Sequence, residues 1–249
     1  NLYQGIASTI SADHKKYWKP EDPNLRINLP KIKIILKKKD DFFPGKKIED
    51  VEKNFSNWPR SHGGFSSMRF SSLDLINKNN VGKLKLAWQF NSNDGKKGIQ
   101  ANPVVYEGMV YLPTPGNNIV CLDGTNGKVI WRYETKKGYN AAKRGLLIWK
   151  DEKNNTLRLY FTNDDQLISL NAKTGKPIKN FGHNGIVKIG SSPIPPAIID
   201  NKLIIGTFRP SIEAYDIENG KLYWKYYLRE ISKENFGEGD FIGGLPWGG

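Results

Sequence analysis

The chain has 249 residues, enough for one or two domains, of which 38% are hydrophobic and 12% aromatic. Its formal net charge is +13, but the lysines are scattered and form neither a basic helix nor a recognised nucleic-acid motif, so we expect no nucleic-acid partner. No run of 18 apolar residues exists, and the single cysteine, Cys121, excludes an internal disulfide and a cysteine-rich metal site.

Residues 1–56 share no pattern with the rest and are expected to form an irregular N-terminal extension. A short apolar run at 32–36 is followed by a basic run at 37–39, which we interpret as a solvated turn, with a membrane-surface contact as the alternative. A short helix is expected near 49–55. Because the first residue is Asn and not Met, we expect the natural N-terminus to lie further upstream.

The stretch Lys83 to Phe90, at the end of residues 57–90, is typical of one strand without its three sheet partners. Three similar units follow it, over about 99–135, 144–182 and 191–228. Each unit has short apolar segments of strand length separated by tight polar turns.

The same turn recurs in all three units. Asp123, Asn171 and Asp216 each follow a strand and precede a Gly-Lys pair four residues later, with spacings of 171 − 123 = 48 and 216 − 171 = 45 residues. Asp and Asn bond to their own backbone two residues on, and glycine takes a positive φ without a steric penalty. Trp131 and Trp224 stand eight residues after their Asp, and Lys179 fills that place in the middle unit.

Four-stranded units repeated at this spacing predict an all-β protein, a β-propeller of four-stranded antiparallel blades. A β-sandwich of similar hairpins is the alternative, but a sandwich does not need the same turn at one fixed place in each unit. We therefore divide the chain into the extension, 1–56, and a partial propeller, 57–249. The propeller part would hold the orphan strand, three full blades and the start of the next.

Several motifs resemble the pyrroloquinoline quinone (PQQ) dehydrogenases, the quinoprotein glucose and alcohol dehydrogenases. They are the Asx-Gly-Lys turns with Trp, RFSSLDLINKNNVGKLKLAW (69–88), IQANPVVYEGMVY (99–111), KRGLLIW (143–149), FGHNGIV (181–187) and GDFIGGLPWGG (239–249). FGHNGIV is similar to the loop that follows the second full blade in that family. The resemblance covers about 57–249 and implies about half of an eight-bladed propeller with PQQ on its axis and calcium beside the quinone.

The resemblance implies an oxidoreductase that oxidises a sugar or alcohol hydroxyl at the quinone and passes electrons to ubiquinone or a cytochrome. A divalent cation would polarise the quinone carbonyl, and a carboxylate base would remove the hydroxyl proton. It also implies a periplasmic location, with association with the inner membrane through a missing N-terminal part. The catalytic base is expected beyond residue 249, so we expect these residues alone to be inactive.

The resemblance also assigns cofactor-binding residues. Arg144, before Gly145, would pair with a cofactor carboxylate, and Trp247 would form the floor of the quinone pocket. Gln100 would bond the quinone edge, and Ser192 and Thr207 would face the axis at blade ends. Their alternatives are a surface arginine, a packing tryptophan, a polar strand end and ordinary hydroxyls.

The metal ligands stay unknown from the sequence. The loop that carries a calcium-binding Glu in the methanol-oxidising branch is reduced here to 208–211, and Glu213 falls in the next strand. The cysteine pair of that branch is also absent, since 139–143 are YNAAK. A functional alternative from another class is a cofactor-free propeller of the same repeats, serving as a scaffold in outer-membrane protein assembly; it would not need Arg144-Gly145 or the segment 239–249.

Overall fold

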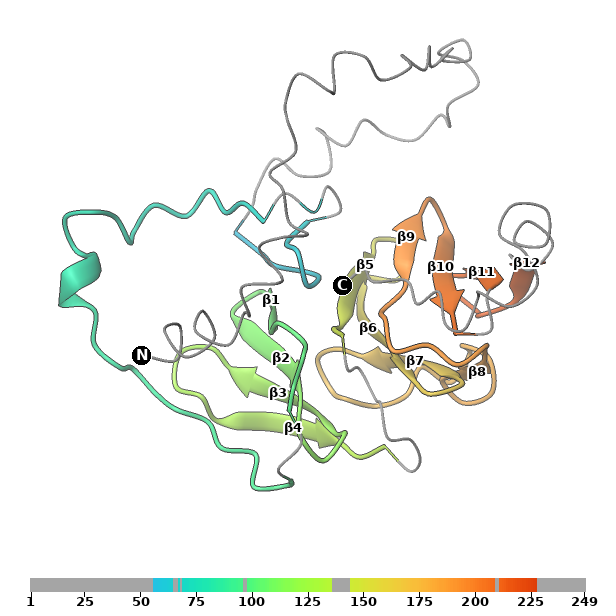
Figure 1. Ribbon diagram of the computed structural model, residues 1–249, viewed down its shortest axis with the longest axis horizontal. Helices are drawn as coiled ribbons and strands as arrows, with labels where there is room; N and C mark the ends of the chain where they lie inside the picture. The colour runs from blue at the N-terminus through green and yellow to red at the C-terminus, as the bar shows by residue number, and fades with distance from the viewer. Residues whose placement is uncertain are drawn as a thin grey trace, which may run out of the picture. The chain divides into compact units, whose positions relative to one another are not determined.

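Three four-stranded antiparallel sheets follow one another along the chain, each built from consecutive strands (Figure 1). The computed structural model describes residues 56–64, 67, 69–95, 98–135, 144–208 and 211–227. The chain divides into two compact units, Asn1–Pro44 and Gly45–Gly249, and all the described residues lie in the second. The repeated meanders confirm the predicted β-propeller class. The extension predicted for 1–56 lies, except for its last residue, outside the described residues and stays a prediction.

Strands pair antiparallel with their neighbours in each sheet. The first sheet contains β1 (Val104–Tyr106), β2 (Met109–Pro113), β3 (Ile119–Asp123) and β4 (Val129–Tyr133). The second contains β5 (Leu147–Asp151), β6 (Thr156–Asn163), β7 (Gln166–Asn171) and β8 (Ile186–Lys188). The third contains β9 (Ala197–Ile199), β10 (Lys202–Thr207), β11 (Ser211–Asp216) and β12 (Leu222–Tyr227). A 3-10 helix, η3 (Val81–Lys83), precedes them, and the described part holds no helix long and apolar enough to cross a membrane.

The recurring turn has the same geometry in all three sheets, as predicted. The backbone N–H of Gly127 donates to the carbonyl of Asp123 at 2.8 Å, and the equivalent bonds in the other two sheets are 2.8 and 2.9 Å. The Asp123 carboxylate accepts a further bond from the backbone N–H of Thr125 at 2.8 Å. Since Gly127 has a φ of +72°, glycine is the residue that closes this turn at least cost.

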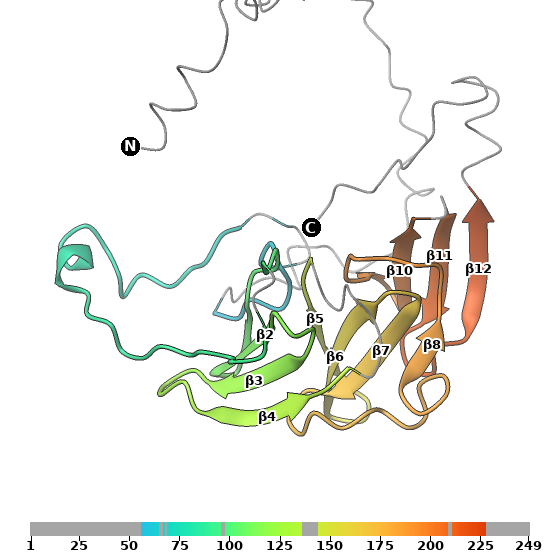
Figure 2. The same ribbon diagram turned by 60° about the horizontal axis from the view of Figure 1, so that its bottom comes forward.

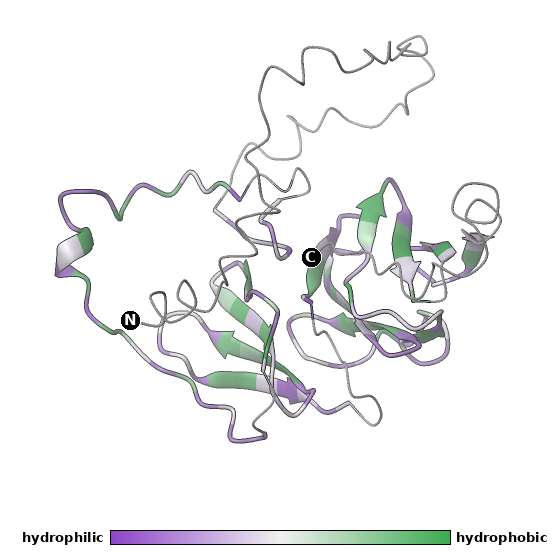
Figure 3. Cartoon of the chain, in the orientation of Figure 1, coloured by the Kyte–Doolittle hydropathy of each residue, from purple (hydrophilic) through white to green (hydrophobic). Residues whose placement is uncertain are grey.

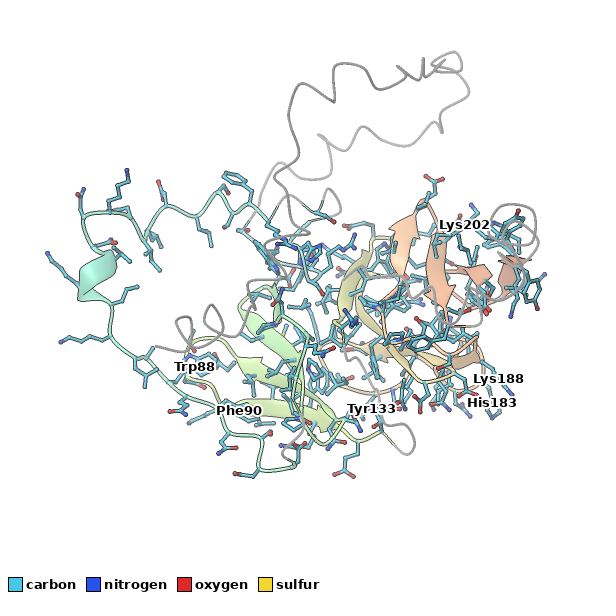
Figure 4. All side chains as sticks on the ribbon, in the orientation of Figure 1. Trp88, Phe90, Tyr133, His183, Lys188 and Lys202 are labelled. Carbon is cyan, nitrogen blue, oxygen red and sulfur yellow. The ribbon has the colours of Figure 1, made fainter. Side chains whose placement is uncertain are left out.

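These glycines also receive the tryptophan of the preceding unit. The indole N–H of Trp131, in β4, donates to the carbonyl of Ala172 at 2.8 Å, and a Cβ at Gly175 would lie 2.7 Å from the ring. Trp88 repeats this contact on the first sheet, where its indole N–H donates to the carbonyl of Gly124 at 2.9 Å. Figure 4 shows Trp88 on the stretch that leads to the first sheet. Each indole therefore occupies the space that a side chain at the glycine would need.

The joint between the second and third sheets is built differently, because Lys179 replaces the tryptophan. Phe181 is fully buried there, and a Cβ at Gly220 would lie 3.2 Å from its ring and 2.4 Å from the side chain of Val187. The backbone N–H of Gly182 donates to the carbonyl of Asn219 at 2.8 Å. A phenylalanine and a valine thus pack where the first joint uses one indole.

The second sheet is buried on both faces. Alternate side chains of its strands pack against the first sheet, among them Ile148, Leu159 and Phe161. The intervening ones pack against the third sheet, among them Leu147 and Tyr160. This double burial explains the continuous apolar runs of the middle repeat, since a strand with one solvated face would alternate (Figures 2 and 3).

Two sequence predictions are wrong in detail. The fourth strand of the middle blade, expected to end near 182, is β8 at 186–188, and the motif FGHNGIV leads into β8 instead of following the blade. Turns around Phe181 follow Pro177, and the strand begins only after them, at Ile186. The stretch Lys83 to Phe90 forms no ladder with any other described residue, and its assignment as an orphan strand without sheet partners stays a prediction.

A buried ion pair within the second sheet holds the arginine that links this sheet to the turn after β11. Arg158 Nη2 lies 3.2 Å from Asp151 Oδ2, and both side chains are almost fully buried. Arg158 Nη1 donates to the carbonyl of Glu218 at 2.7 Å. Burial alone would raise the pKa of Asp151, but hydrogen bonds from Asn154 and the charge of Arg158 outweigh it and lower that pKa.

Replacement of Gly175 by alanine should weaken the joint between the first and second sheets. The alanine would have to adopt a strained positive φ, and its Cβ would displace the indole of Trp131. We therefore expect a loss of about 2–5 kcal/mol in the free energy of unfolding. Gly108→Ala is the matched control, because Gly108 has a φ of +77° with nothing within 4 Å, and it should cost about 1 kcal/mol. Urea denaturation measures both, and equal losses would contradict the role of the indole contact.

Asp151→Asn should leave the charge of Arg158 buried without its partner and cost about 3 kcal/mol at pH 7. The folded-state pKa of Asp151 is lowered, so its ionised form stabilises the fold above the unfolded pKa, and that contribution is lost as the pH falls through the folded pKa. The difference between wild type and variant should therefore narrow with acidification below about pH 4. Unfolding curves at several pH values test this, with the exposed Asp165→Asn as control; a constant difference would exclude the carboxylate as the cause.

Candidate functional site

The predicted site residues gather at one edge of the three sheets, which we call the opening rim. It is the edge at which β1, β5 and β9 begin and β2, β6 and β10 end. Antiparallel pairing places the start of a strand beside the end of its neighbour. Residues that precede a first strand, or end a second strand, therefore share this rim, and the predicted positions are Gln100, Arg144, Ser192 and Thr207.

Backbone contacts bring three of the predicted residues together. The N–H of Arg144 donates to the carbonyl of Pro193 at 3.1 Å, next to Ser192. The N–H of Phe208, directly after Thr207, donates to the carbonyl of Ser191 at 2.8 Å. The structure thus places Arg144, Ser192 and Thr207 in neighbouring segments of the second and third sheets.

The other two predicted residues, Gln100 and Trp247, are not joined to this group by such backbone bonds within the described residues. Gln100 is exposed and lies two residues before Asn102, whose amide donates to the carbonyl of Ser61 at 3.0 Å. Ser61 in turn donates to the carbonyl of Arg144, so Gln100 lies on the same rim as the other predicted residues. Trp247 lies outside the described residues, and its assignment stays a prediction.

Ser192 is buried and offers a hydrogen-bond donor. Its backbone N–H donates to the carbonyl of Asp164 at 2.9 Å, and its hydroxyl oxygen accepts from the N–H of Ile194 at 3.4 Å. Within the described ranges, no group accepts the hydroxyl hydrogen of Ser192. A carboxylate placed against this rim would be a suitable acceptor for it.

Thr207, unlike Ser192, has no hydroxyl hydrogen left to donate to a ligand, because it donates that hydrogen within the third sheet. The Ser211 hydroxyl donates to Glu213 Oε1 at 3.1 Å, so the 2.7 Å contact between Ser211 and Thr207 must have Thr207 as its donor. A hydroxyl carries one hydrogen. Thr207 therefore presents lone pairs to any other group and suits a donor or a cation better than an anion.

Glu213 anchors this network and is the residue that sequence reasoning set aside. Its carboxylate is fully buried, 2.7 Å from Lys225 Nζ, and it accepts a bond from the Tyr215 hydroxyl at 2.5 Å. Burial alone would raise the pKa of Glu213, but the bonds from Lys225, Tyr215 and the backbone N–H of Gly190 outweigh it and lower that pKa. The strand alternation of 211–216 could have indicated it, because Ser211, Glu213 and the buried Tyr215 share one face.

Metal-ligating residues do not cluster in the part of the chain that the structure describes. No group of three or more His, Cys, Asp or Glu side chains lies together there. His183, labelled in Figure 4, is exposed shortly before β8, and Asp164-Asp165 forms the turn between β6 and β7. Cys121 is buried between the first two sheets, and burial raises the pKa of its thiol to about 12, so it carries no thiolate at neutral pH.

Comparison with curated proteins gives alcohol and methanol dehydrogenases among the relatives. The chain is 32% identical over 196 residues to the quinohemoprotein alcohol dehydrogenase ADH IIB of Pseudomonas putida, a match that covers 72% of this chain and 27% of that protein. It is 30% identical over 213 residues to methanol dehydrogenase [cytochrome c] subunit 1 of Methylorubrum extorquens, covering 78% and 34%. The matched region thus spans about a quarter to a third of these relatives.

Solved structures and a family match agree with this. The quinohemoprotein alcohol dehydrogenase of Comamonas testosteroni superposes with a TM-score of 0.57 at 27% identity, over 73% of this chain and 29% of that one. The enzyme ADHIIG of Pseudomonas putida gives a TM-score of 0.59 at 26% identity, over 74% and 28%. Because residues 58–240, which hold all three sheets, match the family described as "Glucose/ethanol/alcohol dehydrogenase, beta-propeller domain", the chain belongs to this PQQ family.

Proposed function

We propose that the protein containing these residues oxidises the hydroxyl group of a small alcohol, with PQQ bound at the opening rim. The observation that carries the proposal is the position of Arg144. Its backbone is bonded to the loop that enters the third sheet and to Ser61, on the rim where the first strands of the sheets begin. The family match favours this function over a cofactor-free scaffold.

The donors on the rim fit the chemistry of a tricarboxylate quinone. Arg144 supplies a guanidinium that matches a carboxylate with two parallel bonds, and the Ser192 hydroxyl and the Gln100 amide supply neutral donors. Thr207 is the exception, since its hydroxyl hydrogen is already donated to Ser211 and only lone pairs remain for another group. We assign Arg144, Ser192 and Gln100 to the carboxylates, and Trp247 to stacking. When bound, the quinone would supply the two-electron acceptor for the alcohol.

Calcium and the catalytic base are the parts of this proposal that the described residues do not supply. Since no three metal-ligating side chains lie together within them, we assign the ion and the base to other parts of the protein. The relatives include an "Alcohol dehydrogenase (quinone), dehydrogenase subunit" of Gluconobacter oxydans, 32% identical over 195 residues, as well as the methanol dehydrogenase [cytochrome c] named above. We propose by analogy a quinone or cytochrome as electron acceptor and a periplasmic location, with membrane association through an upstream segment as an extension of the proposal.

Arg144→Ala should weaken PQQ binding by roughly 2–4 kcal/mol, because a charge-assisted pair is lost and a cofactor carboxylate is left buried without a partner. The measurement is titration of the apoprotein with PQQ, using the longest natural polypeptide that contains these residues. Arg132→Ala is the matched control: Arg132 lies one residue before the end of β4, on the same rim, but pairs with Asp94 at 3.0 Å. Unchanged affinity in Arg144→Ala would remove this residue from the site.

A primary alcohol should reduce an artificial dye in the presence of this polypeptide, PQQ and calcium, and glucose should do so at least tenfold more slowly, about 1.4 kcal/mol in the barrier. The reason is that the named relatives are alcohol and methanol dehydrogenases. Residues 1–249 alone should show no activity. Faster oxidation of glucose would reassign the substrate, and absence of dye reduction with every substrate would contradict the proposed function.

A further inference from the structure

A short segment before the first sheet bridges the first and second sheets on the opening rim. Trp58 exchanges two backbone hydrogen bonds with Val105 of β1, at 2.7 and 2.9 Å. The N–H of Ile148, in β5, donates to the carbonyl of Pro59 at 2.8 Å. Residues 58–61 therefore pair with the first strands of both sheets, and we call them the bridging segment.

Ser61 ends the bridging segment, and its carbonyl and its hydroxyl are both hydrogen-bonded. Its carbonyl accepts bonds from the Asn102 amide at 3.0 Å and from the indole N–H of Trp58 at 3.3 Å. Its hydroxyl donates to the carbonyl of Arg144 at 3.1 Å. Because Ser61 is only 5% exposed, little water competes for these bonds.

The glycine after Arg144 makes room for this contact. Gly145 has a φ of +133°, and a Cβ there would lie only 2.1 Å from the Ser61 hydroxyl oxygen. Any other residue would push the hydroxyl away from the Arg144 carbonyl. The Arg-Gly pair is thus explained by local packing: the arginine carries the charge, and the glycine admits the serine that holds its backbone.

We infer that Ser61 is a positioning residue that fixes the backbone of Arg144 for binding of a cofactor carboxylate. The N–H of Arg144 donates to the carbonyl of Pro193, and its carbonyl accepts from Ser61, so two other segments of the chain fix the backbone from which the side chain extends. An arginine side chain has many rotamers, and a fixed backbone reduces the conformational freedom that is lost on binding. This inference rests on the proposed function of Arg144.

Ser61→Ala tests the inference in the longest natural polypeptide that contains these residues. Loss of one hydrogen bond that positions Arg144 should raise the Kd for PQQ roughly 3–10-fold in equilibrium titration. In an Arg144→Ala background, the same change should leave the Kd unaltered. A purely structural role would raise the Kd equally in both backgrounds, and that result would overturn the inference.

Two further variants keep the test decisive. Tyr160→Phe removes another buried bond to a backbone carbonyl, that of Ile217, away from the rim, and should leave the Kd for PQQ unchanged. Asn102→Ala alters an exposed residue that contacts the Ser61 carbonyl, and should raise the Kd in the same direction even if Ser61→Ala does not fold.

The proposed function and this inference fail in different ways. Wild-type protein that binds no PQQ would overturn both. PQQ binding that depends on Arg144 but not on Ser61 or Asn102 would leave the proposed function standing and overturn the positioning role.

Discussion

Packing of one sheet onto the next depends on a side chain that fills the space over a turn glycine. At the first joint the indole of Trp131 lies against Gly175 and donates to the carbonyl of Ala172. The contact combines apolar burial with a satisfied indole N–H, which a buried tryptophan requires. The same turn that reverses the chain between the last two strands of a sheet therefore also receives the neighbouring unit. One local motif sets both the hairpin and the stacking of the sheets.

The second joint shows which part of this interaction is essential. Phe181 and Val187 replace the indole over Gly220, and the backbone N–H of Gly182 supplies the bond to a turn carbonyl. Apolar contact over the glycine and one N–H donor are kept, whereas the residue that provides them changes. The buried pair of Arg158 and Asp151 adds a polar link at this joint. The residues of the opening rim come from segments that enter different sheets. Their relative positions therefore depend on how the sheets pack at these joints.

The sequence predicts the fold well because its strongest signal is local. Asp123, Asn171 and Asp216 fix the turns through bonds within five residues, so their spacing indicates the repeat directly. The sequence around Lys179 does not indicate that Phe181 fills the space over Gly220, since that contact depends on the neighbouring sheet. At the site, Arg144 and Ser192 could be placed on one rim from strand order. Ser61 could not be assigned, because a hydrogen bond between positions 61 and 144 leaves no periodic pattern. Glu213 was set aside although strand alternation puts it on the face of Tyr215, because an acidic residue in a strand is usually exposed.

The burial of both faces of the second sheet has a consequence for how its sequence can vary. Leu159 and Tyr160 are adjacent in the chain, yet one contacts the first sheet and the other the third. A change of volume at Leu159 affects the packing against the first sheet, and a change at Tyr160 affects the packing against the third, since each interface is closely packed. Covariation among homologues should therefore alternate along β6. One position should covary with residues of the first sheet and the next position with residues of the third.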